Sequence, residues 1–264
     1  MLAAAFLKRD FRIEVSYRLS FVWQLASLVF STATLYFLSG MFEGLPPRSV
    51  TAYGAGYFPF AVVGYALCDT LWTCLSSFSS RIRQDQVVGT LEAMASSPQP
   101  MHRMVLCSGA YPLALALARL TLFLALAAIL GAGFDLLGLV RGVAVLALAF
   151  LTFAALGLIS ASMTLVLKRG DPVAAAVSAM SFLFGGILYP VSALPDGIEW
   201  VASLLPVTYA VEAFRKLAIG GACLADVRFE LMVLAAFAAA GIALAAVAIR
   251  WADRAVRTSG VRNY

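Results

Sequence analysis

The sequence predicts an all-α polytopic membrane protein with six transmembrane helices and both termini in the cytoplasm. Three observations support this fold class. Hydrophobic residues make up 62% of the 264 residues and charged residues only 12%, about half the charged share of soluble domains. Apolar runs long enough to cross a bilayer recur along the chain. Basic residues gather in alternate connections between these runs.

Six segments reach the length of about 20 apolar residues that a membrane-spanning helix needs. Together they form a single transmembrane domain over residues 1–264. The fourth and fifth segments are separated by the short turn Lys168–Asp171. The six segments lie at about 20–42, 57–80, 105–133, 142–167, 172–194 and 229–250.

The distribution of basic residues sets the orientation. Placing both termini in the cytoplasm gives that side thirteen of the nineteen basic residues and the other side five, with Arg119 inside a span. Because the Lys and Arg bias determines topology, the chain is expected to be N-in and C-in. The connection at 83–100 is then cytoplasmic. Basic residues at membrane edges also explain the net charge of +5 without a nucleic-acid partner.

An interfacial helix is expected at 1–19. Phe6, Leu7, Phe11, Val15 and Leu19 recur on one face, and basic residues surround them. This pattern is typical of a helix lying on anionic inner-leaflet lipid. Its charges do not fit a cleavable signal peptide.

The cytoplasmic segment 85–95 is a short amphipathic helix in this interpretation, ended by Pro98 and Pro100. A helix of two or three turns is marginal in water, so it needs a surface to pack against. It either lies on lipid headgroups or docks into a groove of a soluble partner. The docking residues are expected to be Asp85, Val88, Gly89, Leu91, Glu92 and Met94.

Three prolines interrupt the chain after Gly185 and Gly186. The residues between Pro190 and Pro206 are too few to span a bilayer and too apolar for a solvated loop. We expect a re-entrant helical hairpin at 190–206 on the outer face. The alternative is an interfacial helix lying flat and held by Trp200.

Two charged residues fall near the middle of neighbouring spans. Asp69 lies in the second and Arg119 in the third, and an isolated charge at this depth needs a partner. We therefore expect Asp69 and Arg119 to pair, in a structural role rather than a proton relay. A polar stripe follows Asp69 down the second span, so the first, second and fifth spans are expected to line a conduit with their dimer mates. The conduit and gate candidates are Trp23, Ser27, Ser31, Asp69, Thr73, Tyr189, Pro190 and Trp200.

No catalytic, cofactor-binding or metal site is expected in this chain. The sequence holds no G-x-x-x-x-G-K-[ST] phosphate loop, so any ATP and its Mg²⁺ must be bound by a partner subunit. His102 is the single histidine, and the four cysteines form no C-x-x-C pair.

Two segments resemble type-2 ABC exporter permeases. GTLEAMASSP at 89–98 resembles their cytoplasmic coupling-helix region. The segment 185–221 is similar to their C-terminal signature, with Pro190, Leu194–Pro195 and Pro206 followed by Tyr209. With six spans and an amphipathic N-terminal helix, the resemblance covers nearly the whole chain.

The resemblance implies a prokaryotic plasma-membrane translocation unit built from two permeases, either a homodimer or a pair with a paralogous permease. Each permease docks on its own ATP-binding cassette subunit through residues matching 85–95. Such families export drugs, lipids, lipid-linked glycans or capsule polymers. Aromatic residues along the first span and the outer hairpin suit lipid tails, aromatic drugs and sugar rings alike, and an amphipathic lipid or drug is the cargo we expect.

Three other classes of membrane protein fit the sequence less well. An ATP-independent secondary transporter or channel would use Asp69 for ion coupling, but it has no need of a docking helix. Such carriers often have two similar halves, and 1–133 does not resemble 134–264. An ABC importer permease would carry a fuller E-A-A pattern than Glu92–Ala93, and an intramembrane enzyme would need paired catalytic residues.

Overall fold

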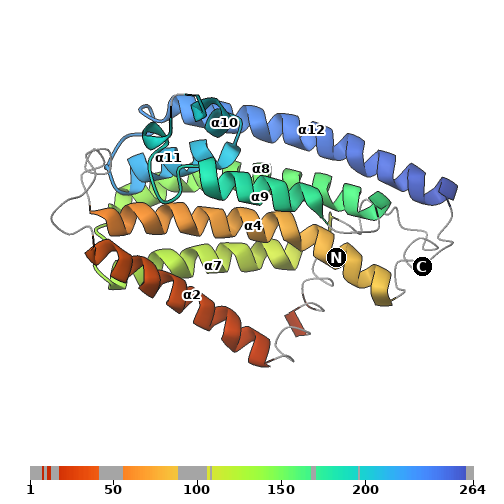
Figure 1. The fold of residues 1–264 in the computed structure, drawn as a ribbon, viewed down its shortest axis with the longest axis horizontal. Coiled ribbons are helices and arrows are strands. Elements are labelled where there is room, and N and C mark those ends of the chain that lie inside the picture. The colour runs from red at the N-terminus through yellow and green to blue at the C-terminus, as the bar shows by residue number, and fades with distance from the viewer. Residues whose placement is uncertain are drawn as a thin grey trace.

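Long helices running side by side form the body of the molecule in the computed structural model (Figure 1). The structure describes residues 8, 11–12, 18–41, 56–88, 106–107, 109–167, 171–195 and 197–259. Within these residues it contains helices and no β-strand, and five helices are long and apolar enough to cross a membrane. These five are α2 (Arg18–Gly40), α4 (Tyr57–Val88), α7 (Ala110–Ile129), α8 (Leu136–Leu167) and α12 (Arg228–Ser259).

Four shorter elements complete the fold. Helix α9 (Pro172–Phe184) lies beside α4 and α8. The 3-10 turn η1 (Val191–Ala193), α10 (Glu199–Ser203) and α11 (Pro206–Ala218) gather at one end of the bundle, which we call the hairpin end (Figure 1). The start of α2 and the ends of α4 and α12 lie toward the opposite end.

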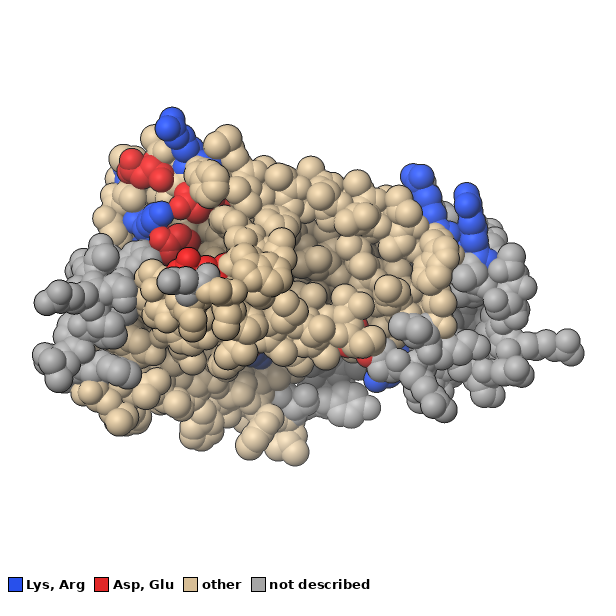
Figure 2. Space-filling model, turned by 45° about the horizontal axis from the view of Figure 1, so that its top comes forward, with Lys and Arg blue, Asp and Glu red and all other residues tan. Residues whose placement is uncertain are grey.

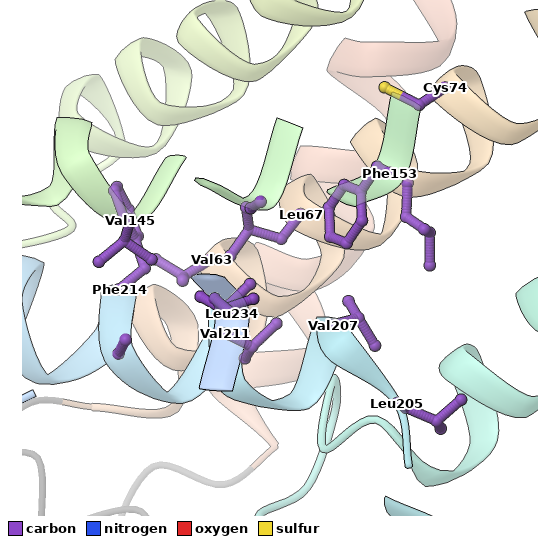
Figure 3. Packing of buried hydrophobic residues seen from close by; sticks show 14 of the residues in the cluster. Val63, Leu67, Cys74, Val145, Phe153, Leu205, Val207, Val211, Phe214 and Leu234 are labelled. Atoms are coloured by element: carbon purple, nitrogen blue, oxygen red, sulfur yellow. The ribbon is translucent and has the colours of Figure 1, made fainter. Parts of the chain in front are cut away.

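The main core lies where α4, α8, α11 and α12 meet. Val63 of α4, Val145 of α8 and Phe214 of α11 are fully buried there, and Leu234 of α12 joins them (Figure 3). Small residues allow the helices to approach closely. A Cβ atom at Gly157 of α8 would overlap the Cys74 carbonyl oxygen of α4. α8 packs against α4, α9, α11 and α12, and is therefore the central helix of the bundle.

Helices α2 and α7 form the other side of the bundle. Leu28 of α2 and Phe123 of α7 pack with Ala66 of α4 in a separate buried cluster. About half of the described α2 side chains are exposed, including Trp23 and Phe37. On the face drawn in Figure 2, charged side chains gather mainly at the two ends of the molecule and leave an uncharged middle band. This distribution is typical of a bilayer-spanning bundle.

The all-helical class is confirmed, and five of the six expected spans correspond to long helices. The fifth differs from the expected segment 172–194. Asp171 caps α9 by accepting a hydrogen bond from the Ala174 amide at 3.0 Å, and the helix ends at Phe184. Its 13 residues extend only about 20 Å, against a hydrocarbon core of about 30 Å. Gly186, with a φ of +70°, turns the chain away where hydropathy alone continues the span.

Two other boundaries differ from the sequence analysis. Helix α4 continues through Val88 rather than ending near residue 80, so residues 85–88 are its last turn and not the start of a separate helix. The predicted interfacial helix 1–19 falls mostly outside the described residues, although Lys8, Phe11 and Arg12 are helical. Residues 89–95 of the predicted coupling helix also lie outside them.

Candidate functional site

Arg215 on α11 is the most deeply buried charged side chain in the described part of the chain, with 1% of its surface exposed. Its guanidinium donates to the Gly186 carbonyl at 2.7 Å and the Ile187 carbonyl at 2.6 Å. It also donates to the Phe60 carbonyl of α4 at 2.9 and 3.1 Å. The guanidinium carbon lies 3.4 Å from the centre of the Phe60 ring, in cation–π geometry.

These bonds join three segments that are far apart in the sequence. The glycine break after α9 leaves carbonyl groups without helical partners, and the Arg215 fork satisfies them while holding them against α4. A Cβ atom at Gly64 would come within 2.5 Å of the Arg215 Nη2 atom and overlap the Ile187 carbonyl oxygen. Gly64 therefore permits the close approach. We call Arg215 with the carbonyls of Phe60, Gly186 and Ile187 the Arg215 cluster.

This cluster was not predicted from the sequence, where Arg215 is one of the five basic residues assigned to the outer side. The sequence feature that could have predicted the cluster is the pair Gly185–Gly186, which interrupts the helix. Carbonyl groups without helical partners at membrane depth need a hydrogen-bond donor. Arg215, in the last turn of the amphipathic helix α11, can supply one.

Asp69 and Arg119, which the sequence analysis paired, lie in direct contact. Arg119 Nε donates to Asp69 Oδ2 at 2.9 Å, and Arg119 Nη2 donates to Asp69 Oδ1 at 2.8 Å. Their side chains are 16% and 17% exposed. A two-bonded fork is the stronger geometry for such a pair, and it joins α4 to α7 inside the bundle.

A groove runs along α4 and α9 beside this pair. It consists of two adjoining pockets of about 560 and 500 Å³ that share Trp72 and Ala175. Ring and polar side chains line it together, including Tyr65, Asp69 and Phe182 in one pocket. Ser76, Ser79, Ser80, Arg83, Gln84 and Asp171 line the other. We call this feature the α4–α9 groove.

The predicted polar stripe only partly faces the groove. Asp69, Ser76 and Ser80 line it, whereas Ser77 is buried and donates to the Cys74 carbonyl. Thr73 is half-buried and donates to the Asp69 backbone carbonyl at 2.8 Å. The groove wall is therefore more apolar than the sequence stripe indicates.

The candidates on α2 separate into two sets. Trp23, Phe30 and Phe37 are exposed by 73, 68 and 75%. With Ser27 and Thr34 between them, they recur at spacings of four and three residues, the pattern of a helix–helix seam. Ser31 points elsewhere, because its hydroxyl lies 3.2 Å from the Tyr65 hydroxyl of α4. We call the set at 23, 27, 30, 34 and 37 the α2 seam.

The three gate candidates lie at the hairpin end in different surroundings. Tyr189 donates its hydroxyl to the Leu183 carbonyl, across the glycine break. Pro190 is buried and lines a cavity beneath α10. Trp200 is 64% exposed, and its indole nitrogen donates to the Gly197 carbonyl at 3.0 Å. Trp200 thus faces outward from the hairpin.

Of the predicted docking residues, the backbones of Asp85 and Val88 belong to the last turn of α4. Gly89, Leu91, Glu92 and Met94 lie outside the described residues. The described residues include no group of three or more His, Cys, Asp or Glu side chains arranged to hold a metal ion.

The model of the ABC-2 type transporter family matches residues 2–219. The chain belongs to the ABC-2 type transporter family. The matched region of this permease includes α2 through α11, and thus the α4–α9 groove, the Asp69–Arg119 pair and the Arg215 cluster. No curated protein was found to be similar to the chain.

Family membership settles the general role of the chain. It is a multi-pass permease, the membrane part of a transporter, and not a catalytic domain. Permeases of this family associate with an ATP-binding cassette partner. The resemblance noted in the sequence is confirmed at this level.

Replacing Arg215 by Met should lower the thermal stability of the permease strongly. Three buried carbonyl groups lose their donor, and each costs about 1–3 kcal/mol when left unsatisfied. Arg215→Lys should recover only part of the loss, because an ammonium cannot reproduce the fork. The measurement is thermal unfolding in detergent followed by tryptophan fluorescence, with the exposed Arg228→Met as control. Equal melting of Arg215→Met and the native protein would contradict the assignment.

Asp69 and Arg119 should show strong energetic coupling in a double-mutant cycle. Asp69→Asn and Arg119→Leu each leave one partner without its counter-charge inside the bundle, so each single change should destabilise. The double variant should lose less than the sum, by about 1 kcal/mol or more. Chemical unfolding in mixed micelles measures the three differences. Simple additivity would mean that the contact contributes no coupling energy.

Proposed function

We propose that this permease belongs to an ATP-driven exporter that moves an amphipathic lipid, drug or lipid-linked glycan out of the cytoplasm. ATP hydrolysis takes place on the separate cassette subunit, which binds ATP and Mg²⁺. One observation carries the proposal: α4 is a single helix from Tyr57 to Val88. It runs from the Arg215 cluster, along the α4–α9 groove, directly into the segment expected to dock on the cassette.

The length of α4 suits it to transmit movement. Its 32 residues extend about 48 Å, more than the hydrocarbon core. Phe60 near its start contacts Arg215, and Asp69 in its middle contacts Arg119. A displacement of residues 85–95 by the cassette would therefore move the groove wall and the support of the hairpin together.

The surfaces exposed on one copy support a homodimer with a shared conduit. The α2 seam exposes the rings of Trp23, Phe30 and Phe37 by 73, 68 and 75%, and the α4–α9 groove is open along its length. Two copies meeting through α2 would bring two grooves together. Rings such as Trp72 and Phe182 beside Asp69 suit a cargo with both apolar and polar parts.

The arrangement of the ends supports the expected topology in a prokaryotic plasma membrane. The end of α4 and the end of α12 lie at the end of the bundle opposite η1, α10 and α11 (Figure 1). Arg81, Arg83, Arg250 and Arg254 belong to those helix ends. With these on the cytoplasmic side, the segment 190–206 becomes an outer re-entrant hairpin that closes the conduit.

The ATP-independent carrier is the weaker candidate. Both Asp69 oxygens already accept hydrogen bonds from Arg119. A carboxylate held in this way is less suited to bind and release a coupling ion.

Leu91→Asp should uncouple the permease from its cassette subunit. A charge on the apolar docking face must be buried on binding, and a loss of at least about tenfold in affinity is expected. Cargo-stimulated ATPase activity of the reconstituted complex should fall to the level of the cassette alone. Gly89→Pro should act similarly by breaking the segment.

The matched control is Leu224→Asp, the same change at an exposed leucine near the start of α12. It should leave both membrane insertion and ATPase stimulation unchanged. Normal ATPase stimulation in both Leu91→Asp and Gly89→Pro would refute the docking role of residues 85–95.

Cysteine cross-linking tests the dimer. In a background without Cys68, Cys74, Cys107 and Cys223, Ser27→Cys and Thr34→Cys on the α2 seam should each give a cross-linked dimer under mild oxidation. Ser31→Cys is the internal control because Ser31 faces Tyr65 of its own chain. The bands are read on non-reducing gels from membranes. Equal dimer yields at all three positions, or none at Ser27 and Thr34, would count against this seam.

A further inference from the structure

A second hollow lies at the hairpin end, away from the α4–α9 groove. It has a volume of about 370 Å³, is partly open to the outside, and is lined by η1, α10, α11 and the start of α12. We call it the hairpin cavity. Its chemically distinctive lining residues are Glu199, Glu212, Glu230, Thr208, Tyr209 and Phe229.

The charge around the hairpin cavity is negative. Three carboxylates line it, and one ammonium lies against two of them: Lys216 Nζ is 2.7 Å from Glu230 Oε1 and 3.3 Å from Glu212 Oε1. Burial alone lowers the pKa of Lys216, but its bond to Glu230 and the charge of Glu212 outweigh that effect and raise the pKa. Lys216 therefore stays charged and is shared between Glu230 and Glu212, whereas Glu199 forms no ion pair with a described residue. Figure 2 shows acidic side chains gathered at this end of the molecule, with basic side chains among them.

Glu230 holds an unused acceptor in the cavity. The residue is only 7% exposed, and Lys216 occupies its Oε1 atom. Its Oε2 atom is buried and accepts no hydrogen bond from the described residues, and the buried Thr208 hydroxyl has no partner among them either. A buried carboxylate oxygen without a donor is costly. The site is thus complete only when a donor or a cation enters the cavity.

The aromatic walls indicate which kind of cation fits. The rings of Tyr209 and Phe229 meet edge to face with centroids 6.3 Å apart, and the Tyr209 hydroxyl is already used by the Ser203 carbonyl at 3.0 Å. Carboxylates beside ring faces recognise organic ammonium groups through charge and cation–π attraction. A bound metal ion would need several converging ligands, and the described residues contain no such group.

We propose that the hairpin cavity binds an organic ammonium group, such as the head group of a cationic amphipath. Glu230 and Glu199 supply the counter-charge, and Tyr209 and Phe229 cover the apolar faces of the cation. That this is the last binding position of an exported cargo rests on the proposed function. The binding itself does not.

The test is equilibrium binding of radiolabelled choline to the purified full-length permease in dodecyl maltoside, an uncharged detergent. Choline should bind saturably, and its neutral isostere 3,3-dimethylbutan-1-ol should displace it at least about tenfold less well, because only the charge differs. Glu230→Gln and Glu199→Gln should each weaken choline binding by about tenfold or more. Asp226→Asn is the matched control, since Asp226 is exposed at the same end and outside the cavity.

Thermal unfolding of each variant distinguishes loss of the site from loss of the fold. Glu199 is exposed on α10, so Glu199→Gln should have little effect on folding. The proposal is overturned if choline does not bind, if the neutral isostere or an equal concentration of Na⁺ or K⁺ displaces it as well as unlabelled choline does, or if both Glu variants keep the native affinity. The assay needs neither ATP nor the cassette. Its failure therefore leaves the export proposal standing, and a failed Leu91→Asp test leaves this one standing.

Discussion

The structure depends on one buried guanidinium. A chain that breaks its helix at membrane depth leaves backbone carbonyls that neither lipid nor helix can satisfy, and such breaks persist only where protein supplies the missing donors. Arg215 supplies them to Gly186 and Ile187 and at the same time bonds the Phe60 carbonyl of α4. The broken segment at Gly186–Ile187, α11 and α4 thus form one unit. Without Arg215, the carbonyls of Gly186 and Ile187, between α9 and α10, would lose this donor.

This arrangement explains why the proposed function depends on α4. It contacts α7 through the Asp69–Arg119 pair, α8 through the close approach at Gly157, and α11 through Arg215. The contacts are spread along its length, so α4 can move only together with parts of several neighbours. Packed cores of this kind respond as units rather than by continuous deformation. In the proposed function, a displacement of the Val88 end of α4 would therefore also displace residues at the hairpin end.

The sequence predicted the parts that depend on local properties. Apolar length located five long helices, and two opposite charges at mid-span in adjacent antiparallel segments were enough to pair Asp69 with Arg119. It failed where hydropathy and helix formation differ. The run FLFGGILYPV is continuously apolar, yet its glycines end α9 at Phe184, whereas the polar residues 81–88 stay helical as part of α4. The contacts of Arg215 and Glu230 join segments distant in sequence, and no periodicity within one segment reports them.

The α4–α9 groove and the hairpin cavity differ in charge, and the hairpin cavity is the more negative of the two. In the α4–α9 groove, Arg119 balances Asp69, so the wall beside this pair carries little net charge. In the hairpin cavity, three carboxylates face one ammonium. A cationic amphipath in the proposed cycle would therefore be attracted from the groove toward the hairpin. Because α11 carries both Arg215 and cavity residues such as Tyr209 and Glu212, a displacement of α4 reaches the cavity wall through the Phe60 carbonyl. In the proposed cycle, the same hydrogen bonds that stabilise the broken helix would connect the nucleotide-driven movement to the release of the cargo.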